Sequence, residues 1–162
     1  MACRVKFTAF HTGRGIISAI DDTTGNKMFN VSQSGSTSGK IRIVARNTQF
    51  RSTDSTSTLS LDTWYDIIAI YRDSTDRELY VDGTSEAVNI DPVNSISTIN
   101  SLSVGQIPDQ SPDDSSSCVI ADVCFWTSNI GSSGISRYSN RESHTIDPAN
   151  LVTYWPLWGS AS

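Results

Sequence analysis

Histidine and cysteine are the residues from which catalytic and zinc sites are most often built, and they are sparse in this sequence. The two histidines, His11 and His144, lie far apart in the chain, and no cysteine stands near either at metal-ligand spacing. The sequence also lacks the Gly-x-Ser-x-Gly turn of a serine hydrolase and a glycine-rich phosphate loop. Nucleophilic and metal-assisted catalysis have no support in these residues, so we expect a protein that is not an enzyme.

The three cysteines are predicted to be free thiols. Cys118 and Cys124 lie six residues apart in one apparent strand, which at about 3.3 Å per residue separates their Cα atoms by roughly 20 Å. A disulfide requires Cα atoms closer than about 7 Å. Cys3 can reach one of them only if the first strand lies beside theirs.

Positive side chains gather on one predicted strand, residues 40–46, where apolar and charged residues alternate. The charged residues that share its outer face are Lys40, Arg42 and Arg46. They are candidates for contact with an anionic glycan or an acidic protein. The alternative is that they protect an edge strand against aggregation.

The composition favours β structure. The chain has 27 Ser and 16 Thr but only 3 Lys, 3 Glu and 6 Leu, so good helix formers are scarce. Its 162 residues predict one domain spanning 1–162. A net charge of −5 argues against nucleic acid as a partner. No apolar run approaches the ~20 residues that cross a bilayer, so membrane insertion is not expected.

The first residues enter an alternating strand directly. Met1 to Phe7 lack the apolar core of a secretory signal. We therefore expect the protein to be made in the cytoplasm of the cell that produces it.

A three-strand meander is the strongest structural signal. Residues 65–71 and 78–81 are dense in β-branched and aromatic side chains, and Asp82-Gly83 then predicts a tight turn into a strand at 86–90. Trp64 opens this unit and is assigned to the core.

Turn and strand signals alternate along the rest of the chain. Strands are expected at 4–10, 16–20, 27–32, 40–46, 48–53, 57–61, 102–105, 118–126 and 151–158. Only 132–142 can hold a helical turn or two, with Ser132 or Ser133 as N-cap. The pattern predicts an all-β antiparallel sandwich or jelly roll.

The strand at 118–126 is apolar on both sides, which is typical of a strand in the middle of a layered structure. The face predicted from simple alternation consists of Val119, Ala121, Val123 and Phe125. Asp122 stands on the opposite face as a carboxylate among hydrophobic neighbours.

The order of these segments resembles a concanavalin A-like, laminin-G-type jelly roll. The resemblance rests on Trp64 at a strand start and on the segments 79–83, 102–105, 120–126, 135–138 and 151–157. It covers most of the chain. Members of this family usually have a further strand or two before the one that starts here at Arg4, so the chain is expected to be either a minimal version of the fold or to have an edge strand open to a partner.

The resemblance implies a function without catalysis. Small domains of this kind are found on bacteriophage heads, fibres and tails, so the first hypothesis is a virion surface protein that decorates or cements the particle. Its partners would be capsid or fibre subunits, its own copies, or a host cell-surface glycan. The alternative is a lectin-like carbohydrate-binding module.

Some relatives are glycoside hydrolases, which need two carboxylates at the scissile bond and usually carry Glu-x-Asp-x-x-Glu on a strand. The three glutamates, Glu78, Glu86 and Glu142, do not form that pattern. Hydrolase activity is therefore the least favoured of the three hypotheses of function.

The family also suggests ligand sites. Sugars stack on exposed aromatic side chains in such folds, and the candidates are Trp126, Tyr154, Trp155 and Trp158. Trp155 and Trp158 are equally consistent with core filling or an intermolecular contact. Related domains often bind calcium through loop aspartates at the sandwich rim. The candidates are Asp21, Asp22, Asp113 and Asp114, although such pairs are also ordinary turn formers.

Overall fold

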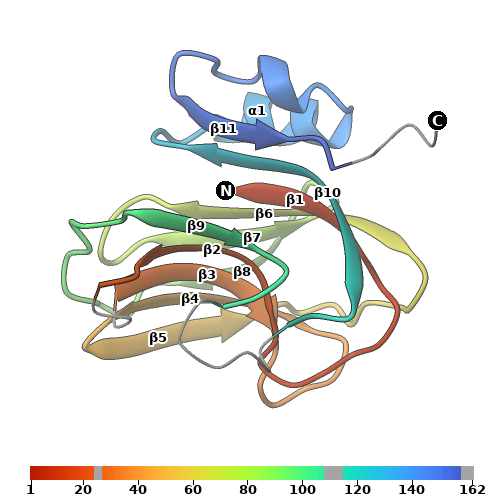
Figure 1. Ribbon diagram of the computed structural model, residues 1–162, viewed down its shortest axis with the longest axis horizontal. Coiled ribbons are helices and arrows are strands. Elements are labelled where there is room, and N and C mark those ends of the chain that lie inside the picture. Colours follow the sequence, from red (N-terminus) through yellow and green to blue (C-terminus); the bar gives the residue numbers. More distant parts are fainter. Residues whose placement is uncertain (24–26, 108–114, 158–162) are drawn as a thin grey trace.

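Two antiparallel β-sheets packed face to face form the computed structural model of this protein, which describes residues 1–23, 27–107 and 115–157 (Figure 1). In spatial order, the first sheet consists of β11 (Leu151–Trp155), β10 (Cys118–Trp126), β1 (Ala2–Phe7), β6 (Trp64–Tyr71), β7 (Arg77–Val81) and β8 (Thr84–Asn89). The second consists of β5 (Gln49–Asp54), β4 (Ile41–Asn47), β3 (Lys27–Gln33), β2 (Gly15–Asp21) and β9 (Ser101–Val104). This architecture confirms the predicted antiparallel β-sandwich.

A short helix, α1 (Gly131–Ser139), and a 3-10 turn, η1 (Ser143–Thr145), follow β10. Among the described residues, no helix is long and apolar enough to cross a membrane. The helix begins after Ile130, and no side chain caps it, so the predicted serine N-caps are wrong.

Two apolar clusters hold these layers together, and β6 contributes to both. Ile67 and Ala69 point between the sheets into the inner cluster, while Ile68 and Ile70 point outward. The outer cluster packs these two residues against Tyr138 of the helix. Successive residues of a strand face opposite sides, so a run apolar at every position can bind both layers.

The meander is confirmed. Strands β6, β7 and β8 are neighbours, and Val81 pairs with Thr84 around the turn. Asp82 and Gly83 at its centre have φ of 49° and 77°. Positive φ at both central residues is what a two-residue hairpin turn of the right twist requires.

A bulge in β10 overturns the predicted face of that strand. Ala2 pairs with Cys124 but Arg4 pairs with Ala121, so β10 has one extra residue there, and Asp122 has φ of 51°. An extra residue reverses the alternation beyond it. Phe125 therefore lies in the inner cluster, whereas Val119 is 45% exposed. The expected position of β10 in the middle of a layered structure is confirmed, because Phe125 belongs to the inner cluster and Cys124 to the outer one.

Two further expectations are wrong. Trp64 lies at the surface, 37% exposed, with the Arg4 guanidinium 5.2 Å and the Lys6 ammonium 5.6 Å from its ring. The neighbouring Tyr65 takes the inward position instead. Residues 57–61 form no strand, and only Leu59 among them is buried.

Candidate functional site

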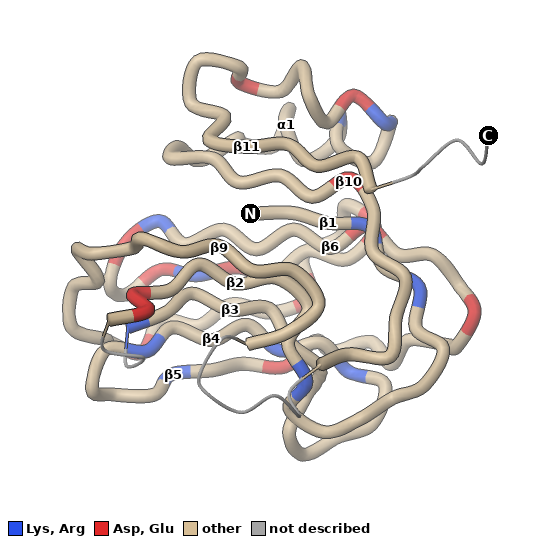
Figure 2. The backbone as a smooth tube through the Cα atoms, in the orientation of Figure 1, with Lys and Arg blue, Asp and Glu red and all other residues tan. Residues whose placement is uncertain are grey.

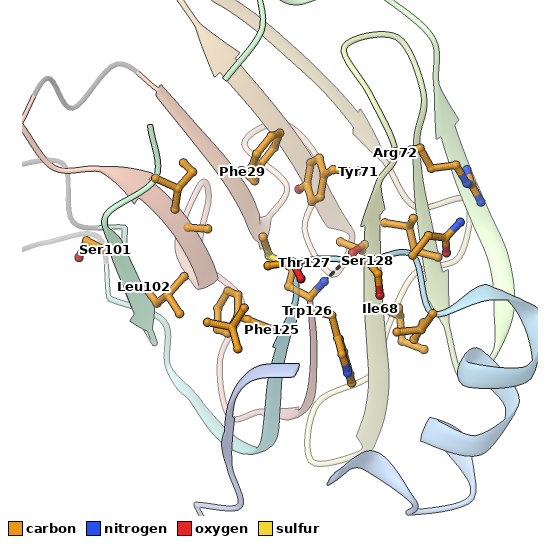
Figure 3. Close-up of a pocket in the computed structure, with 18 of the residues that line it drawn as sticks. Phe29, Ile68, Tyr71, Arg72, Ser101, Leu102, Phe125, Trp126, Thr127 and Ser128 are labelled. Carbon is orange, nitrogen blue, oxygen red and sulfur yellow. Dashed lines mark hydrogen bonds between the residues drawn. The ribbon is translucent and has the colours of Figure 1, made fainter. Parts of the chain in front are cut away.

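A groove opens where the two sheets diverge, at the ends of β6 and β10 beside β9 (Figure 3). We call it the inter-sheet groove; its volume is about 730 Å³. Its walls come from Met1, Ala19, Phe29, 68–72, 99–102, 125–130 and Val152. Ligand pockets typically enclose about 300–1,000 Å³, so the groove has room for a small molecule or one to two sugar rings.

Aromatic rings form much of the groove wall. Phe29 from the second sheet and Tyr71 from the first lie next to each other with tilted rings, as Figure 3 shows. Phe125 and Trp126 follow from β10. The Trp126 indole Nε1 donates a 2.8 Å hydrogen bond to the Ile146 carbonyl oxygen, which fixes the ring. A fixed ring costs a ligand no ordering entropy on binding.

Polar groups form the rim. They are the amides of Asn100 and Asn129 and the hydroxyls of Ser101, Thr127 and Ser128. Several are held in place, since Asn129 Oδ1 accepts from the Gly131 N–H at 2.9 Å and Asn100 Oδ1 from the Asp22 N–H at 3.0 Å. Ser101 Oγ has no hydrogen-bond partner in the described chain.

The groove carries little unpaired charge. Arg72 is its one arginine or lysine among the described lining residues, and none of them is Asp or Glu. The Arg72 guanidinium lies 2.7 Å from Glu78 Oε2 and 2.9 Å from Asp76 Oδ1. These contacts, led by the hydrogen bond that Arg72 donates to Glu78, raise the pKa of Arg72 above its ordinary value. Strands β9 and β11 beside the groove also carry no charged residue (Figure 2).

Of the aromatic residues predicted to bind sugar, Trp126 is the one that lines the groove. Tyr154 lies on the outer face, where its hydroxyl donates to Asp122 Oδ1 at 2.9 Å. Trp155 packs against the inner cluster, edge-on to Phe125 at 6.0 Å. Trp158 lies outside the described residues. Tyr154 and Trp155 are neighbours in a strand and so point to opposite faces.

The groove also contains aromatic residues that the sequence interpretation missed. In the sequence, Phe29 and Tyr71 look like ordinary strand residues, because the contact between their rings joins two strands that belong to different sheets. The one signal in the sequence was that each stands near a strand terminus, where sandwich sheets open.

One of the three basic candidates, Arg42, is already paired within the chain. Arg42 pairs with Asp54 through Nε to Oδ1 at 2.5 Å and Nη2 to Oδ2 at 3.0 Å. Lys40 precedes β4, and Arg46 lies on β4 opposite Phe50. The edge-protection alternative is wrong, because β4 lies between β3 and β5. Contact of these residues with an anionic partner stays a prediction.

Of the four carboxylate candidates for calcium, Asp21 is already engaged. Asp21 is buried; its Oδ1 accepts from Thr23 Oγ1 at 2.5 Å and its Oδ2 from Thr98 Oγ1 at 2.7 Å. The Lys27 ammonium lies 3.3 Å from Oδ2. Asp22 is exposed, while Asp113 and Asp114 lie outside the described residues.

Calcium needs six to eight oxygen ligands. A cation at Asp21 would have to displace the ammonium of Lys27 and the hydroxyls. The described part of the chain also holds no group of three or more His, Cys, Asp or Glu able to bind a metal ion. The residues at Asp21 and Asp22 therefore do not fit a calcium ion.

The glutamates are likewise used elsewhere. Glu78 contacts Arg72 and Ser85, Glu86 contacts Ser57, and Glu142 pairs with Arg137. None of the three lines the inter-sheet groove.

The face-to-face sheets and their strand order define a concanavalin A-like β-sandwich with a groove at its rim. The chain belongs to the concanavalin A-like lectin/glucanases superfamily, whose laminin-G-type model matches residues 1–136. The resemblance inferred from the sequence is thereby confirmed at the level of the family. No curated protein sequence matches the chain.

Solved structures share the fold at low identity. A proposed carbohydrate-binding protein from Bacteroides ovatus is 17% identical, with a TM-score of 0.68 over 98% of this chain and 45% of that one. This chain thus spans less than half of that protein's length. The CBM40 domain of Ruminococcus gnavus IT-sialidase, bound to α2,3 sialyllactose, is 11% identical, with a TM-score of 0.57 over 72% of this chain and 69% of that one.

Proposed function

We propose that this domain is a non-catalytic, lectin-like carbohydrate-binding module whose ligand occupies the inter-sheet groove. The observation that carries the proposal is the combination of a fixed Trp126 ring with amide and hydroxyl groups around the same opening. The apolar face of a sugar ring stacks on aromatic side chains, while its hydroxyls need a few directed polar partners.

The lack of acidic residues in the described lining of the groove supports a function without catalysis. Glycoside hydrolysis requires an acid and a second carboxylate on either side of the scissile bond. Neither Asp nor Glu occurs among the described residues that line the groove. A bound sugar would therefore be held without being cleaved.

The solved structures with this fold are consistent with the proposal. Both are carbohydrate-binding proteins in their descriptions, and one holds a sugar. They support the class of ligand but not the identity of the sugar.

Binding to a broad glycan array, first with calcium and then with EDTA, tests the proposal. We expect binding that survives EDTA, because Asp21 is occupied by Lys27 and hydroxyls. Failure to bind any glycan in either buffer would overturn it.

Variants then locate the site. Trp126→Ala is expected to weaken binding about fivefold or more, since stacking of a nucleobase on an aromatic ring, a comparable contact, is worth on the order of 1–3 kcal/mol. Trp64→Ala is the matched control, because Trp64 is an exposed tryptophan outside the groove. Val152→Asp provides a second test at an exposed position of the mouth, where the fold tolerates a polar residue. Unchanged binding by both groove variants would exclude this site.

As a second candidate we propose a role on the surface of a bacteriophage virion, where the domain would contact capsid or fibre subunits or its own copies. The observation that favours it is the apolar exposure beside two sheet edges: Val88 on β8 is 55% exposed, Ile90 after it 72%, and Val152 on β11 56%. Exposed edges can take up a strand from a neighbour.

Cosedimentation with phage particles that lack the protein tests this role. Saturable binding that Val88→Lys and Ile90→Lys abolish is the expected result. A chain that stays monomeric and never sediments with particles would contradict it and leave glycan binding alone.

A further inference from the structure

A smaller pocket adjoins the inter-sheet groove. This side pocket, of about 190 Å³, shares Phe29, Tyr71 and Arg72 with the groove. Its remaining walls are Asp73, Ser74, Val93, Asn94, Ser95 and Ile96. The two cavities are therefore adjacent, and the Phe29–Tyr71 ring pair contributes to the walls of both; we call the two cavities together the ligand path.

Polar atoms in the side pocket are available to a ligand. The hydroxyls of Ser74 and Ser95 and the Oδ1 of Asn94 make no hydrogen bond to any described residue. All three side chains belong to exposed residues. They supply two donors and three acceptors, which match the hydroxyl or amide groups of a sugar.

The backbone that carries these groups is fixed. Arg77, only 1% exposed, donates to the Ser74 carbonyl oxygen at 2.8 Å and to the Asp91 carbonyl oxygen. The Val93 N–H donates to the Ser74 carbonyl at 3.0 Å, and the Asn47 amide to the Ser95 carbonyl at 2.6 Å. These hydrogen bonds hold both sides of the side pocket in place before a ligand binds, which lowers the entropy cost of binding.

The charges along the path disfavour an anionic ligand. Arg72 is neutralised by Asp76 and Glu78, and the other charged side chain described on the path is the acidic Asp73. The terminal amine of Met1, whose pKa burial lowers to about 6, donates to the Ala69 carbonyl oxygen at 2.9 Å. The whole chain carries a net charge of −5. A sugar carboxylate would meet no unpaired cationic side chain and would be repelled at longer range.

The walls of the main groove are largely apolar. Ile68, Leu102 and Phe125 line it together with Trp126. Such a surface favours ligands with methyl groups next to their polar atoms, because each buried CH₂ or CH₃ contributes hydrophobic free energy.

Building on the proposed function, we propose that the ligand is a neutral, N-acetylated oligosaccharide. One unit lies in the inter-sheet groove with its acetyl methyl against the apolar wall. The adjoining unit lies in the side pocket, within reach of Ser74, Asn94 and Ser95. The Phe29–Tyr71 pair lies under the linkage between them.

Calorimetric titration with four sugars tests this inference: N-acetylglucosamine, triacetylchitotriose, cellotriose and 3′-sialyllactose. We expect triacetylchitotriose to bind about tenfold or more tightly than the monosaccharide, since it fills both cavities. Cellotriose, which lacks the acetyl groups, should bind more weakly than triacetylchitotriose, and 3′-sialyllactose more weakly than either.

A variant of the side pocket separates its contribution. Asn94→Ala is expected to lower the affinity for triacetylchitotriose about three- to tenfold, as for the loss of one hydrogen bond, and to leave that for N-acetylglucosamine unchanged. Asn140→Ala, an exposed asparagine outside both cavities, is the matched control and should change neither.

The outcomes distinguish this inference from the proposed function. Equal affinities for one and three units, with no effect of Asn94→Ala, would overturn the extended ligand while glycan binding stands. Tightest binding of 3′-sialyllactose would overturn its neutral character. If none of the four sugars nor any other glycan bound, both proposals would fall.

Discussion

Tyr71 and Phe29 join the two sheets at the inner end of the groove, with ring centroids 4.6 Å apart and ring planes inclined by 48°. The Tyr71 hydroxyl also donates a 2.8 Å hydrogen bond to the Asn30 carbonyl oxygen, which belongs to the opposite sheet. Burial raises the pKa of Tyr71, so the hydroxyl remains a donor at neutral pH. The side chain of Tyr71 therefore both lines the ligand path and links the two sheets.

Tyr71→Phe keeps the ring and removes the hydrogen bond between the sheets. We expect the free energy of unfolding to fall by about 1 kcal/mol, the usual net value of such a bond. Urea denaturation monitored by tryptophan fluorescence measures it. Tyr65→Phe is the control, since the Tyr65 hydroxyl accepts only from the exposed Ser60 N–H. Equal stability of the Tyr71 variant and the unaltered protein would contradict the role assigned to this bond.

Asp122 organises the outer layer at the β10 bulge. Its Oδ1 accepts from Tyr154 Oη at 2.9 Å and from Ser143 Oγ at 3.4 Å, and its carbonyl accepts from Tyr138 Oη at 2.5 Å. Asp122→Ala leaves two hydroxyls without their acceptor and places alanine at positive φ. We expect a loss of about 2–3 kcal/mol in the free energy of unfolding.

Asp122→Asn is the matched variant, because asparagine keeps an acceptor oxygen and tolerates positive φ. It should lose less than half as much stability as the alanine variant. Similar losses for both in chemical denaturation would show that the carboxylate oxygens do not hold this layer.

Acid should destabilise the protein partly through Asp21. Hydrogen bonds from Thr23, then Thr98, hold the pKa of Asp21 well below its ordinary value of 3.8. A carboxyl whose pKa is lower in the folded state contributes stability above its unfolded pKa, and this contribution is lost as the pH falls through the folded value. Thermal midpoints should therefore decline below about pH 4.

Asp21→Asn removes this titration. Its midpoint should be lower than that of the unaltered protein at pH 7, and the gap should narrow towards pH 2. A gap that stays constant between these pH values would refute the assignment.

The thiols should be unreactive in the native protein. Burial raises the pKa of Cys118 to about 11 and that of Cys124 to about 12. Cys3 lies on β1 beside β10, but it faces the inner cluster while Cys124 faces the outer one, so the two are not placed to form a disulfide. Since the thiolate is the reactive form, iodoacetamide at pH 8 should label the folded chain slowly and the urea-unfolded chain fast. Rapid labelling of the native protein would contradict this.

The aromatic candidates show how much of the site could be predicted from the sequence. Trp126 was predicted and lines the groove, whereas Tyr154 and Trp155 point to opposite faces of β11. The prediction of which residues share a face of β10 failed at Asp122. The bulge there depends on the pairing with β1, and it cannot be recognised from the alternation of residues in the sequence.

The sequence by itself determined what depends on neighbours in the chain. Scarce helix formers, alternating strands and the Asp82-Gly83 turn are local features, so the β-sandwich and its meander follow from them. The tertiary structure alone decided the site. Phe29 meets Tyr71, and Leu102 packs against the inner cluster that contains Phe125, only once the two sheets have packed in one register. That register is set by the close packing of residues far apart in the chain.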